Sequence, residues 1–346
     1  MTRDKGILIK NIYYMLTYAF QVLKQSNYEE IASEDFENIQ DLLSAILAKG
    51  IAQQLKQGLY REYVSRCDSL PVLRGKLDIY GTIQNEVQCR RLLSCEYDEL
   101  TENNLFNQIL KTTAVILARE KSVQQTHRTA LKKVLLFFDD IDILEPSAIE
   151  WKRLSFQRSN RTYRMLLNIC YFVIDGMLLT TEKGTYKVAT FREEHMSRLF
   201  EKFVLEYYRY HHHHLSASPA QIAWNVDDGV SDFLPRMSTD ITLKNQEKTL
   251  IIDTKYYTRT MQTHAQYDSH TLHSNNLYQI FAYVKNQDRQ NTGNVSGMLL
   301  YAKTNEAITP DCDFLISGNK ISVKTLDLNV AFHDIAAQLN VIAASF

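Results

Sequence analysis

Residues 239–257 read TDITLKNQEKTLIIDTKYY, and this stretch carries the most informative pattern in the chain. The apolar run 250–252 is typical of a buried strand. It ends on Asp253, and Lys255 follows two residues later. Burying a carboxylate or an ammonium costs free energy unless each group meets a partner or a metal ion. The pattern therefore predicts a strand whose end carries either a salt bridge or a reactive site.

Asp253 and Lys255 project from the same face of this predicted strand, because strand side chains alternate between faces. The segment KNQE, residues 244–247, has the composition of a tight turn that joins two antiparallel strands. Such a hairpin brings Asp240, at the start of the first strand, close to Asp253 at the end of the second.

Two neighbouring carboxylates repel each other unless a cation lies between them. Oxygen ligands favour a hard ion such as Mg²⁺ or Mn²⁺. A lysine beside them can orient or deprotonate an attacking water and offset charge that grows on a phosphate. Asp240, Asp253 and Lys255 together indicate phosphodiester hydrolysis. An exposed ion pair at the end of a surface hairpin is the alternative interpretation.

A predicted helix over residues 275–287 follows, with Ser274 as a candidate N-cap. Gln279 and Tyr283 are four residues apart and share one face of this helix. Such a pair can approach an attacking water and a DNA backbone, although ordinary helix surface and core would explain it as well.

The composition describes a globular protein with room for two domains. The chain has 346 residues, of which 45% are hydrophobic and 23% are charged. A formal net charge of −1 excludes a protein that binds nucleic acid through its overall charge, so any DNA-binding surface must be local. The five cysteines are scattered and form no CxxC pair, which argues against a disulfide framework or a zinc site and favours the cytoplasm. Polar residues interrupt the apolar stretch 7–23, so we expect a buried amphipathic helix there and no membrane segment.

The pattern of segments predicts an α+β protein of two domains, with a boundary near Pro146. The expected domains are residues 1–150, mainly helical with short strands, and residues 151–346, a mixed α/β domain. Helices are predicted at 7–24, 37–62, 101–120, 126–138, 165–181, 193–210, 275–287 and 329–346. A turn with short strands is predicted at 69–83, and strands at 221–226, 239–244, 249–256, 296–303 and 321–328. The basic stretch 151–164 would either contact phosphates or form a solvated, domain-joining face.

The carboxylates, the lysine and the Gln-x3-Tyr helix together resemble the PD-(D/E)xK nuclease superfamily, in its RecB-like branch. Longer motifs in both halves of the chain resemble the McrC family, the endonuclease subunit of the McrBC modification-dependent restriction systems. These motifs are NIYYMLTYAF (11–20), ILAKGI (46–51), RGKLDI (74–79), ENNLFNQILK (102–111), LPRMSTDI (234–241), LIIDTKYY (250–257) and NNLYQ (275–279). The resemblance implies that residues 151–346 form a restriction-endonuclease-like domain.

The resemblance also implies roles for individual residues. Asp240 and Asp253 would bind Mg²⁺, for which Mn²⁺ can substitute, helped by the backbone carbonyl of Thr254. Lys255 would position or activate the attacking water, and Gln279 would assist it. The family pattern has a proline before the first aspartate, where this chain has a threonine.

Many relatives in the wider superfamily use a glutamate on the helix that precedes the strands. Glu201 is the candidate here, and a solvated helix charge is the alternative.

The chain contains no GxxxxGK[ST] motif, so we expect it to bind no nucleotide through a P-loop. The resemblance implies a McrB-like AAA+ GTPase hexamer as partner, engaged by the N-terminal domain, and double-stranded DNA as substrate. The implied function is that of the endonuclease subunit of a GTP-dependent restriction complex directed at 5-methylcytosine-type modification, which also stimulates its partner's GTPase. The alternatives are a stand-alone RecB-like repair nuclease and a non-catalytic subunit that only stimulates the GTPase.

Two groups of histidines remain open in the sequence. The run His211–His214 suits a solvated helix end or a metal site. His264, His270 and His273 either border the path of the DNA or reflect ordinary loop polarity.

Overall fold

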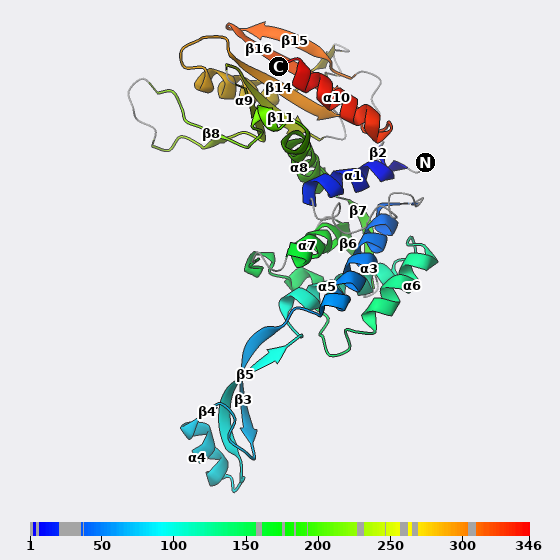
Figure 1. Cartoon of the computed structure of the whole chain (residues 1–346), viewed down its shortest axis with the longest axis vertical. Helices are drawn as coiled ribbons and strands as arrows, with labels where there is room; N and C mark the ends of the chain where they lie inside the picture. The colour runs from blue at the N-terminus through cyan, green and yellow to red at the C-terminus, as the bar shows by residue number, and fades with distance from the viewer. Residues whose placement is uncertain are drawn as a thin grey trace. The chain divides into compact units, whose positions relative to one another are not determined.

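The computed structural model divides the chain into two compact units, residues 1–42 with 176–346, and residues 43–175. The sequence predicted a boundary near residue 150, whereas residues 151–175 belong to the second unit and the first helix belongs to the C-terminal unit (Figure 1). The described residues are 3–4, 7–20, 36, 38–156, 161–174, 177–182, 185–191, 193–226, 232–245, 247–256, 262–264, 269–303 and 309–346.

The first helix, α1 (Ile9–Phe20), is almost entirely buried in the first unit. The side-chain amide of Asn11 donates to the backbone carbonyls of Leu328, at 2.7 Å, and Val330, at 2.8 Å. The hydroxyl of Tyr18 is hydrogen-bonded to Nε2 of His211 at 2.8 Å. The two Asn11 contacts join residues more than 300 positions apart, and the Tyr18 contact joins residues 193 positions apart. No helix in the described part of the chain is long and apolar enough to cross a membrane.

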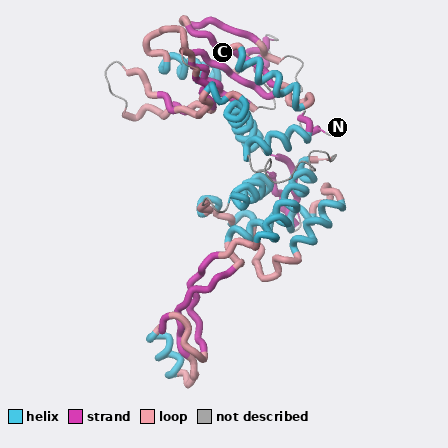
Figure 2. The backbone as a smooth tube through the Cα atoms, viewed as in Figure 1, coloured by secondary structure: helices cyan, strands magenta, loops and turns pink. Residues whose placement is uncertain are grey.

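A five-stranded mixed sheet, in magenta in Figure 2, forms the centre of this unit. Its strand order is β10-β11-β14-β16-β15. The pairs β11–β14 and β14–β16 are parallel, whereas both edge strands run antiparallel to their neighbours. The bounds are β10 (Ile241–Lys244), β11 (Thr249–Lys255), β14 (Val295–Ala302), β15 (Cys312–Ile316) and β16 (Asn319–Leu326). The predicted strands in this region are therefore confirmed, and β15 is an additional one.

Helices cover both faces of the sheet. Helix α9 (Ser274–Gln287) lies between β11 and β14 in the chain and packs closely on β14. A Cβ atom at Gly297, on β14, would lie only 2.7 Å from the side chain of Ile280, on α9. Helices α8 (Glu193–His211) and α10 (Phe332–Ala344) pack on each other, and the hydroxyl of Tyr208 donates to the carbonyl of Leu339. Because β11 is buried on both faces, its apolar run is continuous.

Short two-stranded pairs complete the first unit. They are β1 (Arg3–Asp4) with β2 (Ile7–Leu8), β6 (Met177–Glu182) with β7 (Thr185–Phe191), β8 (Gln221–Ile222) with β9 (Met237–Ser238), and β12 (Gln262–His264) with β13 (Ser269–Thr271). The helix predicted over 165–181 is wrong at its end, because residues 177–182 pair as a strand. A short apolar run does not distinguish helix from strand until its partner is known.

The second unit contains a helical body. Its helices are α3 (Ile39–Gln57), α5 (Leu105–Arg119), α6 (Gln125–Leu135) and α7 (Arg161–Ile174), with short 3₁₀ turns at Pro146–Ala148 and Trp151–Arg153. The core includes the fully buried Ile46, Ile109, Leu110 and Leu166. The helix predicted over 37–62 ends earlier, at Gln57. Gly58 follows with φ +92°, a left-handed conformation that terminates helices.

A three-stranded sheet with one helix, which we call the arm (residues 62–101), extends from this body (Figure 1). It consists of β3 (Glu62–Leu70), β4 (Lys76–Leu77), α4 (Ile79–Val87) and β5 (Leu93–Thr101). The sequence predicted only a turn and short strands at 69–83. Strand β3 is exposed along nearly its whole length, so it lacks the apolar alternation that would have revealed it.

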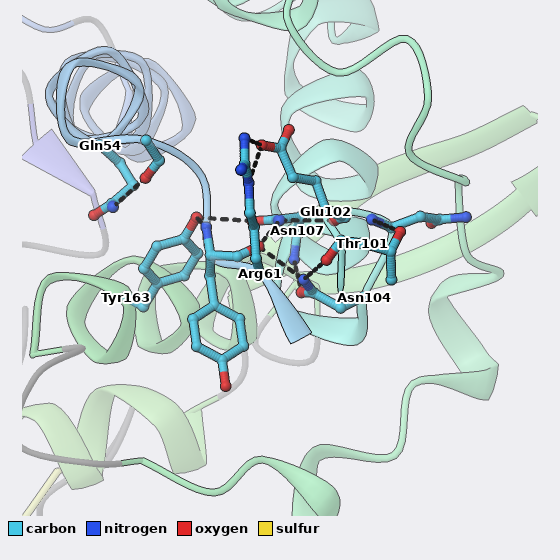
Figure 3. A network of polar contacts seen from close by, with 10 residues as sticks. Gln54, Arg61, Thr101, Glu102, Asn104, Asn107 and Tyr163 are labelled. Carbon is cyan, nitrogen blue, oxygen red and sulfur yellow. Dashed lines mark hydrogen bonds and ion pairs between the residues drawn. The ribbon is translucent and has the colours of Figure 1, made fainter. Parts of the chain in front are cut away.

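Polar contacts fix the root of the arm to helices α5 and α7 (Figure 3). The hydroxyl of Tyr163 accepts from the backbone N–H of Tyr60 at 2.7 Å and donates to Asn107 Oδ1 at 2.8 Å. The amide of Asn107 donates to the carbonyls of Tyr60 and Glu102, both at 2.8 Å. Asn104 caps α5 and also donates to the Tyr60 carbonyl. The ENNLFNQ motif therefore anchors the two chain segments that enter and leave the arm.

Candidate active site

The hairpin β10–β11 brings the two predicted aspartates together. Ile241 pairs with Ile252, so Asp240, one residue earlier, lies opposite Asp253. The Oδ2 atom of Asp240 accepts hydrogen bonds from the backbone N–H of Thr254, at 2.7 Å, and from its hydroxyl, at 2.9 Å. These bonds fix the orientation of the Asp240 carboxylate at the end of β11.

Asp253 is the most deeply buried member of the cluster, with only 2% of its surface exposed. Its Oδ2 atom lies 2.7 Å from the ammonium of Lys255. Among the described residues, this atom accepts no hydrogen bond of good geometry beyond that ion pair. Burial raises the pKa of Asp253 to about 6; Lys255 opposes this increase, whereas the charge of Asp240 adds to it. The carboxylate is thus held in an environment that favours a nearby cation.

Lys255 connects the strand to helix α9. Its ammonium donates to Oε1 of Gln279 at 3.3 Å, and Nε2 of Gln279 donates to the hydroxyl of Tyr283 at 2.9 Å. Only 15% of the lysine side chain is exposed. The structure therefore places Gln279 in direct contact with the lysine of the hairpin, and Tyr283 in contact with Gln279.

Glu201, on helix α8, faces the same cluster. Burial, together with the charges of Asp240 and Asp253, raises its pKa to about 7, against the opposing effects of Arg198 and Lys255. The sequence left the place of this residue open. The structure brings its carboxyl group within electrostatic reach of both aspartates.

The residues present fit a Mg²⁺ ion. Magnesium binds proteins through one or two carboxylates and keeps several waters, and Asp240 and Asp253 offer two carboxylates at one end of the hairpin. The Oδ2 atom of Asp253 is buried and incompletely hydrogen-bonded, and such an ion would compensate its negative charge. No group of three or more histidine, cysteine, aspartate or glutamate side chains with metal-binding geometry occurs in the part of the chain that is described.

Comparison with known proteins identifies the family. A family model described as "McrBC 5-methylcytosine restriction system component" matches residues 3–302. The chain belongs to this family. Membership of the family, which the motifs predicted, is therefore confirmed. The match includes the arm, the helical body and the hairpin of the candidate site.

Individual members of the McrBC family are similar over most of their length. The "Type IV methyl-directed restriction enzyme EcoKMcrBC" of Escherichia coli (strain K12) is 29% identical over 330 residues, which are 93% of each protein. A half-complex from a tetradecameric assembly of Thermococcus gammatolerans McrB AAA+ hexamers with bound McrC matches 96% of this chain and 76% of that one. The TM-score is 0.55 and the identity 18%, so this match supports the fold.

The histidines that the sequence left open lie in different surroundings in this McrBC family chain. His211 and His212 are bound to Tyr18 and Asn340, both at 2.8 Å, which favours a structural role for the start of the histidine run. His273 directly precedes α9, whereas the side chains of His264 and His270 lie outside the described residues.

The basic stretch is only partly described, because residues 157–160 lie outside. Within it, Arg153 pairs with Glu150 at 2.6 Å, and the guanidinium of Arg164 lies 5.8 Å from the ring of Phe156. Phosphate binding by this stretch therefore stays a prediction.

Proposed function

We propose that this chain is the Mg²⁺-dependent endodeoxyribonuclease subunit of a cytoplasmic restriction complex directed at 5-methylcytosine-type modification in double-stranded DNA. The observation that carries this proposal is the meeting of Asp240, Asp253 and Lys255 at adjacent ends of β10 and β11. Membership of the McrBC family supports the class of substrate. The Escherichia coli relative, described as a methyl-directed restriction enzyme, supports it as well.

Each side chain has a chemical role in this proposal. Asp240 and Asp253 would hold Mg²⁺, and the ion would supply a Lewis acid for negative charge on the phosphate. Lys255, held by Gln279, donates hydrogen bonds to the attacking water or to a phosphate oxygen. Glu201, with its pKa raised to about 7, is placed to accept a proton from that water near neutral pH.

The substitution Asp253→Asn tests this assignment, because it preserves the shape of the side chain and removes its charge. Cleavage of methylated DNA, measured with the GTPase partner and GTP, should fall by at least about 100-fold. Asp313→Asn is the control, since Asp313 is exposed on β15 and pairs with Lys320 at 3.1 Å. A parental cleavage rate in the Asp253→Asn protein would refute the nuclease site.

The second unit carries a surface suited to a protein partner. Ile79, Ile83 and Val87 lie four residues apart on α4, so they form one stripe, and their exposed fractions are 67%, 54% and 78%. A helix that turns its apolar stripe to solvent marks a docking surface. The Thermococcus complex contains a McrB AAA+ hexamer. We therefore assign binding and stimulation of an AAA+ GTPase to residues 43–175, through the arm, instead of to residues 1–150.

Substitutions in the stripe test this division of labour in the full chain. Ile83→Ser combined with Val87→Ser should weaken capture of the GTPase and reduce stimulation of its GTP turnover. Leu315→Ser is the matched control, because Leu315 is 80% exposed on β15 in the other unit. The chain alone should hydrolyse no GTP, since it lacks a P-loop. Undiminished capture by the double variant would exclude the arm as the docking surface.

A further inference from the structure

The loop between β8 and β9 is anchored on helix α9, two turns after Gln279. Nε1 of Trp224 donates to the carbonyl of Pro235 at 2.6 Å, which ties the two sides of the loop together. The backbone N–H of Asn225 donates to Oδ1 of Asn286 at 2.7 Å, on the same helix α9 that carries Gln279. The base of the loop is therefore fixed to an element of the site.

Phe233, two residues before Pro235, is unusual in both its exposure and its backbone conformation. Its relative exposure is 106%, so the ring is completely presented to solvent. Its φ is +69°, in the left-handed region that costs free energy for any residue with a Cβ atom. A loop that needed only this backbone turn would favour glycine or asparagine. The chain instead holds a large apolar ring in water on a strained backbone, and such outliers suggest a functional role.

The residues that follow extend this surface. Leu234 and Arg236 are also exposed, so the sequence Phe-Leu-Pro-Arg offers three apolar groups and then a cation. Apolar wedges of these residue types enter the minor groove of DNA and partly unstack a base step, while arginine is attracted to the negative potential of the groove. The apolar residues and the charge thus suit a DNA duplex, the substrate proposed for the neighbouring carboxylates.

The wedge lies within reach of DNA bound for cleavage. Asp240 is only seven residues after Phe233, so their Cα atoms are separated by at most about 25 Å. That distance is shorter than one turn of duplex, about 34 Å. The loop is therefore close enough to Asp240 to contact a duplex within one helical turn of a phosphate bound at the site.

We propose that Phe233 and Leu234 form a wedge that enters the minor groove and unstacks a base step within one turn of the cleaved phosphate, with Arg236 holding the backbone. This inference rests on the proposed nuclease function and adds a mode of substrate binding to it. The wedge bends or opens the duplex next to the site, and so determines where along the DNA the phosphate meets the carboxylates.

The substitution Phe233→Gly provides the test, because it removes the ring and suits a positive φ. The probe is a short methylated duplex with 2-aminopurine at successive positions, bound by the full chain with its partner and GTP, with Ca²⁺ in place of Mg²⁺. The parent should give increased fluorescence at one step. Phe233→Gly should abolish this increase and bind the duplex about tenfold more weakly, with an unchanged or higher melting temperature.

Two variants serve as controls. Phe233→Leu should retain part of the fluorescence increase, because leucine is also a wedge residue. Leu315→Ala, another exposed apolar residue on the same unit, should behave as the parent.

The outcomes separate this inference from the nuclease proposal. Parental fluorescence and affinity in Phe233→Gly would overturn the wedge, while the loss of cleavage in Asp253→Asn would still stand. Weakened capture of the GTPase by Phe233→Gly, with unchanged DNA binding, would identify a protein contact and also overturn the wedge. If the parent bound no duplex, alone or with its partner, both proposals would fail.

Discussion

The ammonium of Lys255 lies 2.7 Å from the carboxylate of Asp253, two residues earlier on the same face of β11. Both groups are largely withdrawn from water, so each limits the desolvation cost of the other. The lysine holds the pKa of Asp253 at about 6 against the combined effects of burial and of Asp240. The two charges therefore form one unit, and removing one partner changes the protonation of the other.

Replacing Lys255 with methionine should lower the cleavage rate and also change its pH dependence. Loss of one positive donor at the phosphate typically costs about 10²- to 10³-fold in rate. Without the ammonium, the pKa of Asp253 should rise further, so the rising limb of the pH–rate profile should move to higher pH. Single-turnover cleavage across pH 5 to 9 measures both effects.

The control for this substitution is Lys248→Met, since Lys248 is exposed at the other end of β11. A slower Lys255→Met enzyme with an unshifted pH profile would contradict the coupling of the two residues.

Glu201→Gln should identify the third carboxylate of the site. The amide cannot take up a proton or neutralise a cation, so we expect cleavage to fall by about 10²-fold and the Mg²⁺ requirement to increase. Titrating Mg²⁺ in a cleavage assay measures both quantities. Glu194→Gln is the control on the same helix, where the glutamate is exposed and pairs with Arg198 at 2.6 Å. Equal activity of the two variants would show that Glu201 is a solvated helix charge.

Thermal stability should respond to Mg²⁺ in a pH-dependent way. The pKa of Asp253 is raised to about 6 and that of Glu201 to about 7, so the folded chain keeps protons that the unfolded chain loses near pH 4. Without a metal, this pair should therefore lower the stability as the pH rises from about 4 to 7. Mg²⁺ binds only the deprotonated folded site, so its stabilising effect should be small at pH 5 and larger at pH 8.

Melting curves with chelator and with Mg²⁺ at both pH values measure this difference. Asp253→Ala should lose most of the gain from Mg²⁺, because it removes one of the two carboxylates proposed to hold the ion. An equal gain from Mg²⁺ in both proteins would place the metal elsewhere.

Asn107→Ala should loosen the root of the arm. It leaves the carbonyl of Glu102 and the hydroxyl of Tyr163 without their partner Asn107, which should lower the free energy of unfolding by about 1–3 kcal/mol. Denaturant titration measures the loss, and stimulation of the GTPase should decrease with it. Asn103→Ala in the same segment is the control, because its contact with Asp142 is exposed. Equal stability of the two variants would contradict the anchoring role of Asn107.

The arrangement of the candidate site on the hairpin could be predicted from the sequence because its determinants are local. Strand alternation places Asp253 and Lys255 on one face, and a short turn fixes the antiparallel pairing that brings in Asp240. Helical spacing likewise determines that Gln279 and Tyr283 share one face. Each of these relationships spans fewer than about twenty residues and depends on backbone periodicity alone.

Glu201 and the division into units depended on the tertiary structure. Many exposed glutamates occur on helices, and only the packing of α8 near β11 distinguishes Glu201 from them. The bonds from Asn11 to Leu328 and Val330 join α1 to residues more than 300 positions away, which no local pattern records. The sequence alone determined which side chains occur together on one strand or helix, since chain geometry is short-range. Which elements then meet was decided by burial and hydrogen bonding between distant segments, because those free energies exist only in the folded chain.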